Sequence, residues 1–211
     1  MPMLRLYESI STSLLEIKAV SLRPDSPFTW TSGLKSPIYC DNRLTMSYPQ
    51  IRNMIAEGFV QIIRMEYPDV EVVAGTATAG IPHAAWVADK LNLPMIYIRD
   101  KAKGHGKGNQ IEGVLKPGQK VIVIEDLIST GGSSLKAALA ARDAGGDVQA
   151  VLAIFTYEFP QAQQLFTENE ISMQTLTTYS ELIDVALKQG YIEENTMDKL
   201  KAWRENPAAY E

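Results

Sequence analysis

The chain has 211 residues, the size of one domain or of a domain with a small appendage. Its 20 Lys and Arg residues against 25 Asp and Glu residues give a net charge of −5, which argues against broad, sequence-independent affinity for nucleic acid. Cys40 is the only cysteine, which excludes an intramolecular disulfide and any zinc site built from several thiolates.

The N-terminal stretch does not have the pattern of a targeting segment. Arg5, Glu8, Glu16 and Lys18 interrupt the region where a signal peptide needs an unbroken apolar core. The longest apolar runs, such as 150–155, have the length of a strand and are far too short to span a membrane. We therefore expect a cytoplasmic protein with neither a membrane nor a nucleic acid as partner.

Two amphipathic helices are predicted in the first seventy residues. The opening helix has apolar residues at helical spacing and is followed by Pro24; these residues are Leu6, Ile10, Leu14 and Ile17. The second helix covers 48–66 and has the clearest one-sided apolar stripe in the chain, formed by Ile51, Met54, Ile55, Phe59, Ile62 and Ile63.

From residue 70 onward, short apolar runs alternate with segments of helical composition. The predicted strands are 70–75, 94–98, 120–125, 148–155 and 172–178. The predicted helices are 81–91, 132–143, 160–168 and 180–189, with a final surface helix over 193–205. Apolar strands that alternate with helices indicate a parallel sheet covered on both faces. We thus expect one domain over 1–211, with an N-terminal lobe (1–69), an α/β core (70–190) of about five mostly parallel strands and a C-terminal helix (191–211). Ligands of such sheets bind beyond the carboxyl ends of the strands.

Residues 121–134, VIVIEDLISTGGSS, carry the strongest functional signal. A buried strand, Val121–Ile124, leads into two carboxylates and then into a cluster of small residues that opens a helix. Glycine N–H groups, hydroxyls and the helix N-terminus together favour a bound phosphate. Glu125 and Asp126 are pure acceptors when ionised, so they suit the 2′- and 3′-hydroxyls of a ribose 5-phosphate. The alternative is a solvated acidic pair followed by a Ser/Thr helix cap.

Two competing phosphate motifs do not fit. A P-loop requires Lys after its last glycine, whereas Ser133 follows Gly132. The glycines at 104, 106 and 108 superficially resemble a dinucleotide fingerprint, but no helical pattern follows them.

A basic loop lies between the second and third predicted strands. Residues 99–108 contain four basic residues and one acidic residue, a local charge of +3, together with three glycines. A mobile cationic lid is what a reaction with a pyrophosphate leaving group requires. The alternative is an ordinary solvated basic loop.

The 121–134 segment closely resembles the motif with which type I phosphoribosyltransferases bind 5-phosphoribosyl-1-pyrophosphate (PRPP). The resemblance covers nearly the whole chain and is strongest to the orotate phosphoribosyltransferase family. The further matching segments are FTWTSGLKSPIYCDNR (28–43), AGTATAGIP (74–82) and YIRDKAKGHGKGNQIEG (97–113). We name 28–43 the hood, because it resembles the segment that covers orotate in that family. The resemblance implies a type I phosphoribosyltransferase core with an N-terminal hood lobe. It also implies transfer of phosphoribosyl from PRPP to orotate for UMP biosynthesis.

The resemblance also implies roles for individual residues. Lys103 and Asp126 would be catalytic, and Ile38, Tyr39 and Ser129 would contact orotate. The implied PRPP contacts are Arg99, Lys103, His105, Glu125, Asp126, Leu127, Ile128, Ser129, Thr130, Gly131, Gly132 and Ser133. No dedicated metal site is expected, since Mg²⁺ would be held mainly by substrate oxygens. The family forms homodimers in which the lid (99–108) completes the partner's site.

The chain departs from many relatives at three positions. Ala79 stands where they have Lys, Asp100 where they have another cation, and the region of Tyr157 lacks an Arg that meets orotate. Lys35 is the candidate substitute for a cation that some members carry at Thr31. Two other functions remain open: transfer to uracil or a purine base, and a PRPP-sensing regulator without catalysis.

Overall fold

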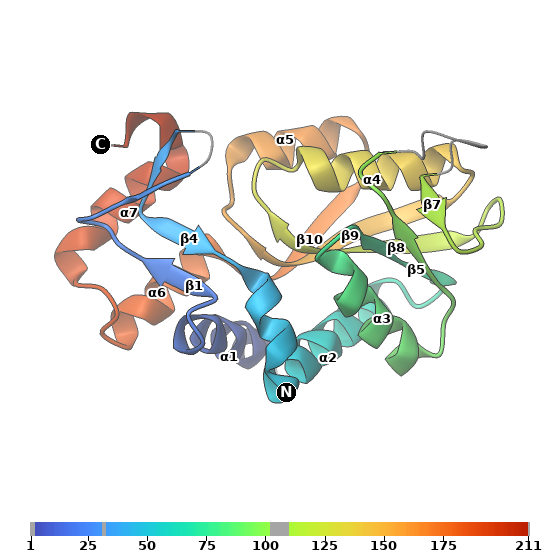
Figure 1. Cartoon of the computed structure of the whole chain (residues 1–211), viewed down its shortest axis with the longest axis horizontal. Coiled ribbons are helices and arrows are strands. Elements are labelled where there is room, and N and C mark those ends of the chain that lie inside the picture. The colour runs from blue at the N-terminus through green and yellow to red at the C-terminus, as the bar shows by residue number, and fades with distance from the viewer. Residues whose placement is uncertain (1–2, 31–32, 102–109, 211) are drawn as a thin grey trace.

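A six-stranded sheet forms the centre of the molecule in a computed structural model that describes residues 3–30, 33–101 and 110–210 (Figure 1). The strand order is β10-β9-β8-β5-β6-β7. All neighbours are parallel except β7, which runs antiparallel to β6. The strands are β5 (Val72–Thr76), β6 (Met95–Ile98), β7 (Ile111–Glu112), β8 (Lys120–Ile128), β9 (Asp147–Thr156) and β10 (Ser172–Thr178).

Helices cover both faces of this sheet, as Figure 1 shows. One face carries α1 (Met3–Glu16), α2 (Pro49–Glu66), α3 (Gly80–Leu91) and α6 (Tyr179–Lys188); the other carries α4 (Gly132–Asp143) and α5 (Pro160–Glu168). The alternation along β8 explains the arrangement. Ile122 and Ile124 pack with the first group of helices, and Val121 and Val123 pack with the second. The unbroken apolar run 121–124 of β8 therefore contributes side chains to two separate cores.

The hood adds short antiparallel pairings to the N-terminal lobe. Strand β1 (Val20–Leu22) pairs with β4 (Ile38–Cys40), and β2 (Phe28–Thr29) pairs with β3 (Lys35–Ser36). The 3-10 helix η1 (Asn42–Ser47) then leads into α2. The chain ends with η2 (Glu194–Thr196), α7 (Met197–Glu205) and η3 (Pro207–Ala209), and Figure 1 places α7 on the same side of the molecule as β1 and β4.

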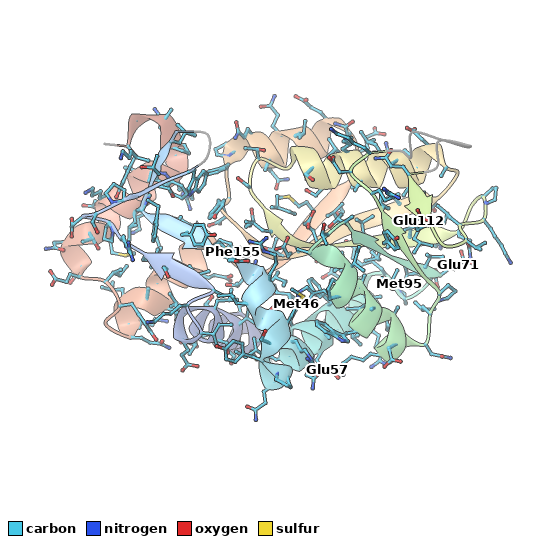
Figure 2. All side chains as sticks on the ribbon, viewed as in Figure 1. Met46, Glu57, Glu71, Met95, Glu112 and Phe155 are labelled. Carbon is cyan, nitrogen blue, oxygen red and sulfur yellow. The ribbon has the colours of Figure 1, made fainter. Side chains whose placement is uncertain are left out.

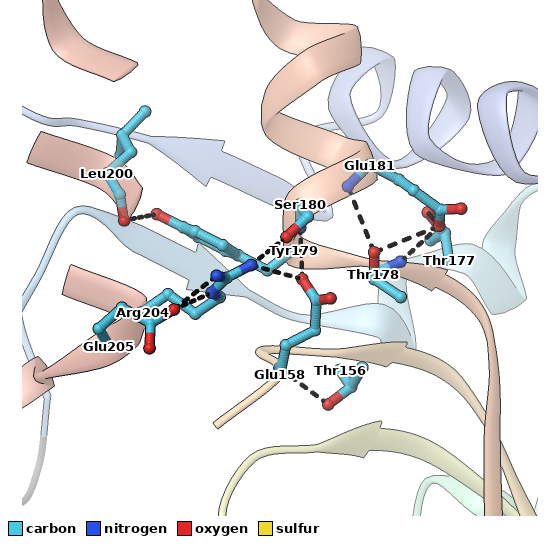
Figure 3. A network of polar contacts seen from close by, with 10 residues as sticks. All are labelled: Thr156, Glu158, Thr177, Thr178, Tyr179, Ser180, Glu181, Leu200, Arg204 and Glu205. Carbon is cyan, nitrogen blue, oxygen red and sulfur yellow. Dashed lines mark hydrogen bonds and ion pairs between the residues drawn. The ribbon is translucent and has the colours of Figure 1, made fainter. Parts of the chain in front are cut away.

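A polar network fixes α7 to the carboxyl end of the sheet (Figure 3). Thr178 and Glu181 form a capping box at the start of α6. The Glu158 carboxylate accepts a hydrogen bond from the Ser180 N–H at 2.6 Å. Arg204 of α7 donates to Ser180 Oγ and lies 3.8 Å from a Glu158 carboxylate oxygen. The C-terminal helix is thereby held beside the loop that follows β9.

The sequence predictions for the core are confirmed. Each of the five predicted strands and each predicted core helix is present, most with ends within one or two residues. The strand predicted over 120–125 continues to Ile128, because its end still pairs with β9. Strand β7 was not predicted, since two residues are too few to show a periodic pattern. Among the described helices, none combines the length and apolar composition needed to cross a membrane.

Candidate active site

A loop of small residues connects β8 to α4 at the carboxyl edge of the sheet. Gly131 has a φ of +82° and is the N-cap of α4, which begins at Gly132. The first-turn N–H groups of a helix have no partner within the helix. Thr130, Gly132 and Ser133 are exposed there. The loop therefore offers backbone N–H groups, hydroxyls and the positive end of a helix to an anion.

The two carboxylates lie on β8, immediately before this loop. Glu125 is only 8 % exposed, and its Oε1 accepts a hydrogen bond from the Asp126 N–H at 3.0 Å. Burial, reinforced by the negative charge of Asp126, raises the pKa of Glu125 to about 8. Burial also raises the pKa of Asp126. The pair thus retains a proton near neutral pH, and donors such as sugar hydroxyls would stabilise its ionised form.

A small recess beside the pair gathers several cationic and hydroxyl side chains. It lies between the end of β5 and the first turns of α4, and Thr76, Arg99, Asp100, Ser133 and Lys136 line it. The Lys136 ammonium lies 3.0 Å from Asp100 Oδ1 and donates to the Asp100 carbonyl at 2.7 Å. Lys136 therefore compensates the negative charge that Asp100 introduces at this edge.

Arg99 is held in place by its neighbours on the edge of the sheet. Its Nη1 lies 3.3 Å from Oε1 of Glu112, which Figure 2 labels on β7. Its N–H donates to the Gln110 carbonyl at 2.8 Å. The short strand β7 thus orients the first residue of the predicted lid.

An apolar cavity of about 660 Å³ opens between the hood and the loop that follows β8. Its walls are Phe28, Thr29, Trp30, Leu34, Tyr39, Cys40, Leu127, Ser129, Thr130 and Tyr157. The predicted orotate contacts Tyr39 and Ser129 both line it, whereas the Ile38 side chain is fully buried and does not. The predicted substitute cation Lys35 donates to Thr29 Oγ1 at 3.0 Å, at the rim of the cavity. Ser129 and Thr130 line the cavity and also belong to the loop of small residues between β8 and α4, which we call the phosphate loop. The cavity and this loop are therefore continuous.

Aromatic rings form the floor of this cavity. The Trp30 and Tyr157 ring centroids lie 5.4 Å apart. Trp203 of α7 packs edge-on against both of them, at 5.9 Å from Trp30 and 5.7 Å from Tyr157. Trp203 is almost completely buried, so the C-terminal helix supports the cavity from behind without lining it.

Known proteins share the sequence pattern and the fold of this chain. The sequence model of the phosphoribosyl transferase domain matches residues 47–156, more than half of the chain. The orotate phosphoribosyltransferase of Halalkalibacterium halodurans is 59% identical over 202 residues, covering 96% of both chains. This chain belongs to the orotate phosphoribosyltransferase family.

Solved structures of the family have the same fold. The orotate phosphoribosyltransferase of Aeropyrum pernix has a TM-score of 0.75 at 27% identity, over 87% of this chain and 99% of that one. The Mycobacterium tuberculosis enzyme in complex with PRPP has a TM-score of 0.65 at 21% identity, over 84% of this chain and 98% of that one, which shows the shared fold alone.

Most of the residues expected to bind PRPP belong to the described part of the chain, and two do not. Those from Glu125 to Ser133 and Arg99 lie together at the carboxyl edge. Lys103 and His105 lie outside the described residues, so their roles stay predictions. Leu127 lines the cavity, and the Ile128 side chain is buried in the core against α4 and α5.

Small residues form the N-terminus of α3. Ala79 is the N-cap of α3, and Gly80 follows it. A Cβ at Gly80 would lie 2.4 Å from the Ile124 carbonyl and 2.5 Å from Thr76 Oγ1. The N-terminus of α3 therefore packs directly against the backbone of β8.

Sequence reasoning missed Lys136 and Trp203. Lys136 stands three positions after Ser133 on one helix, a spacing that puts both on the same face, so this residue could have been found. Trp203 had no such signal, because 73 residues separate it from Thr130 and only tertiary packing brings them near.

Proposed function

We propose that this chain transfers the 5-phosphoribosyl group of PRPP to N1 of orotate and releases orotidine 5′-monophosphate and pyrophosphate, a step of UMP biosynthesis. The observation that carries the proposal is the continuity of an aromatic cavity with a phosphate loop through Ser129 and Thr130. The names of the relatives at about 59% identity support the choice of orotate as the base.

The sugar phosphate would occupy the edge of the sheet from β8 to α4. Its 5-phosphate accepts hydrogen bonds from the N–H groups and hydroxyls of 129–133. The ribose hydroxyls donate to Glu125 and Asp126, whose buried carboxylates are costly to ionise without such donors. The pyrophosphate lies toward the recess that contains Arg99 and Lys136.

Orotate would lie flat in the cavity between the hood and the loop. Tyr39 and Trp30 offer aromatic faces, and Ser129 offers a hydroxyl close to the sugar. Lys35 of the hood hairpin, at the rim, is the cation that would meet the carboxylate of the base. A planar anion thus finds apolar walls and a small number of polar groups.

Magnesium fits this arrangement as a substrate-bound ion. The described residues contain no group of three or more His, Cys, Asp or Glu side chains arranged to hold a metal ion. Glu125 and Asp126 nevertheless present adjacent carboxylates, and Mg²⁺ commonly combines one or two carboxylates with substrate oxygens and water. When bound, the ion would neutralise charge on the diphosphate.

The residues of the chain act mainly by positioning and electrostatics. Departure of pyrophosphate leaves positive charge on the sugar, which the carboxylate of Asp126 stabilises. The positive charges of Arg99 and, by resemblance, Lys103 would stabilise the leaving group, and His105 would donate a hydrogen bond or a proton to it. No covalent intermediate with the protein is needed, so a strong nucleophile is not required.

We also propose a cytoplasmic homodimer in which the lid of each subunit completes the partner's site. Complementation tests this assembly: Lys103→Ala and Asp126→Asn impair different parts of one shared site. After random exchange, half of the dimers are mixed and each has one intact site, so about a quarter of wild-type activity returns. No recovery despite demonstrated subunit exchange would exclude shared sites.

The substrate assignment is tested by the ultraviolet absorbance of orotate incubated with PRPP, Mg²⁺ and the protein. Uracil, hypoxanthine and adenine are run in parallel. We expect loss of orotate with release of pyrophosphate and no reaction of the other bases. Turnover of another base alone would retain the PRPP site but reject orotate, and turnover of none would favour the regulator.

A further inference from the structure

A buried amide connects the hood to the strand that carries the two carboxylates. Asn42 begins η1, which follows the hood strand β4 after one residue, and is only 1 % exposed. Its Nδ2 donates to the Asp126 carbonyl at 2.7 Å, across 84 residues of sequence. Its own carbonyl accepts a hydrogen bond from Thr45 Oγ1 at 2.6 Å, and its Oδ1 lies 3.4 Å from Cys40 Sγ. All of its polar groups named here have partners, so its side chain has one defined orientation.

The contacts of Asn42 join two parts of the site that must act on one another. Tyr39 and Cys40, just before it, are walls of the base cavity. Asp126, which it binds, is the proposed ribose ligand on β8. We propose that Asn42 is a positioning residue that sets the base cavity at a fixed distance from the ribose carboxylates. This inference rests on the proposed function, because it concerns the approach of the base to the sugar.

The other contacts between the hood and the body of the protein cannot set this distance as sharply. Trp30 packs on Tyr157 and Trp203 with ring centroids 5.4 Å and 5.9 Å away. Such contacts tolerate sliding, because apolar attraction has no preferred direction. The 2.7 Å hydrogen bond from the buried Asn42 is directional and weakens steeply when its angle changes. Within the described part of the hood, Asn42 therefore supplies a directional restraint toward the sheet.

Loss of this restraint should affect turnover more than binding. Each substrate would still find its own subsite, because Asn42 lines neither the cavity nor the recess. Reaction requires the attacking nitrogen and the sugar carbon to be closely aligned, and a displacement of about 1 Å can lower the rate about 100-fold. We expect kcat of Asn42→Ala to fall at least about tenfold, with KM for orotate and for PRPP within about threefold of wild type.

Ser11→Ala is the matched control variant. It removes a hydrogen bond of 2.6 Å between Ser11 and Thr177, two fully buried residues that lie far apart in sequence and line neither the cavity nor the recess. Asn42→Ser provides a milder change if Asn42→Ala does not fold. The full-length proteins are compared by melting temperature, kcat and KM for each substrate, at a temperature where all are folded.

The expected result is a loss of kcat in both Asn42 variants, smaller for Asn42→Ser, with an unchanged kcat in Ser11→Ala at similar or lower stability. Unchanged kcat in a folded Asn42 variant, or an equal loss in Ser11→Ala, would overturn the inference. A loss confined to KM of one substrate would also overturn it. Wild-type turnover with the panel of bases is measured first, and if another base reacts, the variants are compared on that base, so the two proposals fail separately.

Discussion

The phosphate end and the base end of the site are built from the chain in different ways. The phosphate end needs mainly one continuous stretch, 125–133, whose strand, loop and helix follow one another directly. The base end combines the hood, the loop after β8 and Tyr157, with Trp203 behind them. The structure of the phosphate end therefore follows from short-range rules for strands, glycine turns and helix N-termini. The structure of the base end depends on tertiary packing between distant segments.

The two ends also differ in their electrostatics. The carboxylates at the phosphate end are buried, and their pKa values are raised in the absence of a ligand. The base cavity instead presents mostly apolar and aromatic walls. Substitutions at the phosphate end should consequently have large effects that depend on charge. Those at the base end should have smaller effects that depend on shape.

Asp126→Asn should produce the largest loss. The substitution removes a charged acceptor from the ribose hydroxyls, and a hydrogen bond to a charged group contributes about 1.5–3 kcal/mol. We expect kcat/KM for PRPP to fall about 100-fold. Steady-state kinetics check this, with the exposed Asp184→Asn as the control that should retain wild-type values. A loss below threefold in Asp126→Asn would contradict the assignment of the carboxylate.

Glu125→Gln should change the dependence of stability on pH. The pKa of Glu125 is raised to about 8 in the folded protein, from an ordinary value of 4.5. Between these values the folded state binds more protons than the unfolded state, so wild-type stability falls as pH rises. The neutral variant lacks this loss and should gain about 3–4 kcal/mol relative to wild type between pH 5 and 8. Urea unfolding of both proteins across this range measures the difference. If the free energies of unfolding of the two proteins changed with pH in parallel, burial of the Glu125 carboxylate would be contradicted.

Trp30→Ala should weaken the base end selectively. The indole is a wall of the cavity, and aromatic contacts contribute about 0.5–1.5 kcal/mol beyond buried area. We expect KM for orotate to rise about tenfold, with KM for PRPP within about twofold. Trp86→Ala, on α3 beneath Arg52, removes an indole outside the cavity and serves as the control. Equal changes in both KM values would mean that Trp30 supports the whole fold and not the base subsite.

Lys136→Met should have the smallest effect. Lys136 and Asp100 form a partly exposed ion pair, and such pairs contribute about 0–1 kcal/mol. We expect KM for PRPP to rise about threefold, because the uncompensated Asp100 carboxylate then faces the pyrophosphate. Adding Asp100→Asn should return KM for PRPP most of the way to the wild-type value. A double variant as impaired as Lys136→Met alone would show that the ammonium contacts the substrate directly.

The sequence predicts the fold, and the strand, loop and helix formed by 121–134, for physical reasons. Strands buried on both faces are apolar throughout, and β8 shows this from Val121 to Ile124. The same sequence gives little warning of β7, which is too short for a pattern and forms by pairing with β6. Asn42 is equally hard to foresee, because its partner Asp126 is 84 residues away. The aromatic floor depends on α7, whose place beside the hood comes from packing between distant segments.

The most direct test of the account is a crystal structure of the protein with orotidine 5′-monophosphate, since this product occupies both ends at once. We predict the phosphate against 129–133, the ribose hydroxyls on Glu125 and Asp126, and the base between Tyr39, Trp30 and Ser129. A base found outside the hood cavity, or a phosphate away from the N-terminus of α4, would contradict the continuity of the two ends.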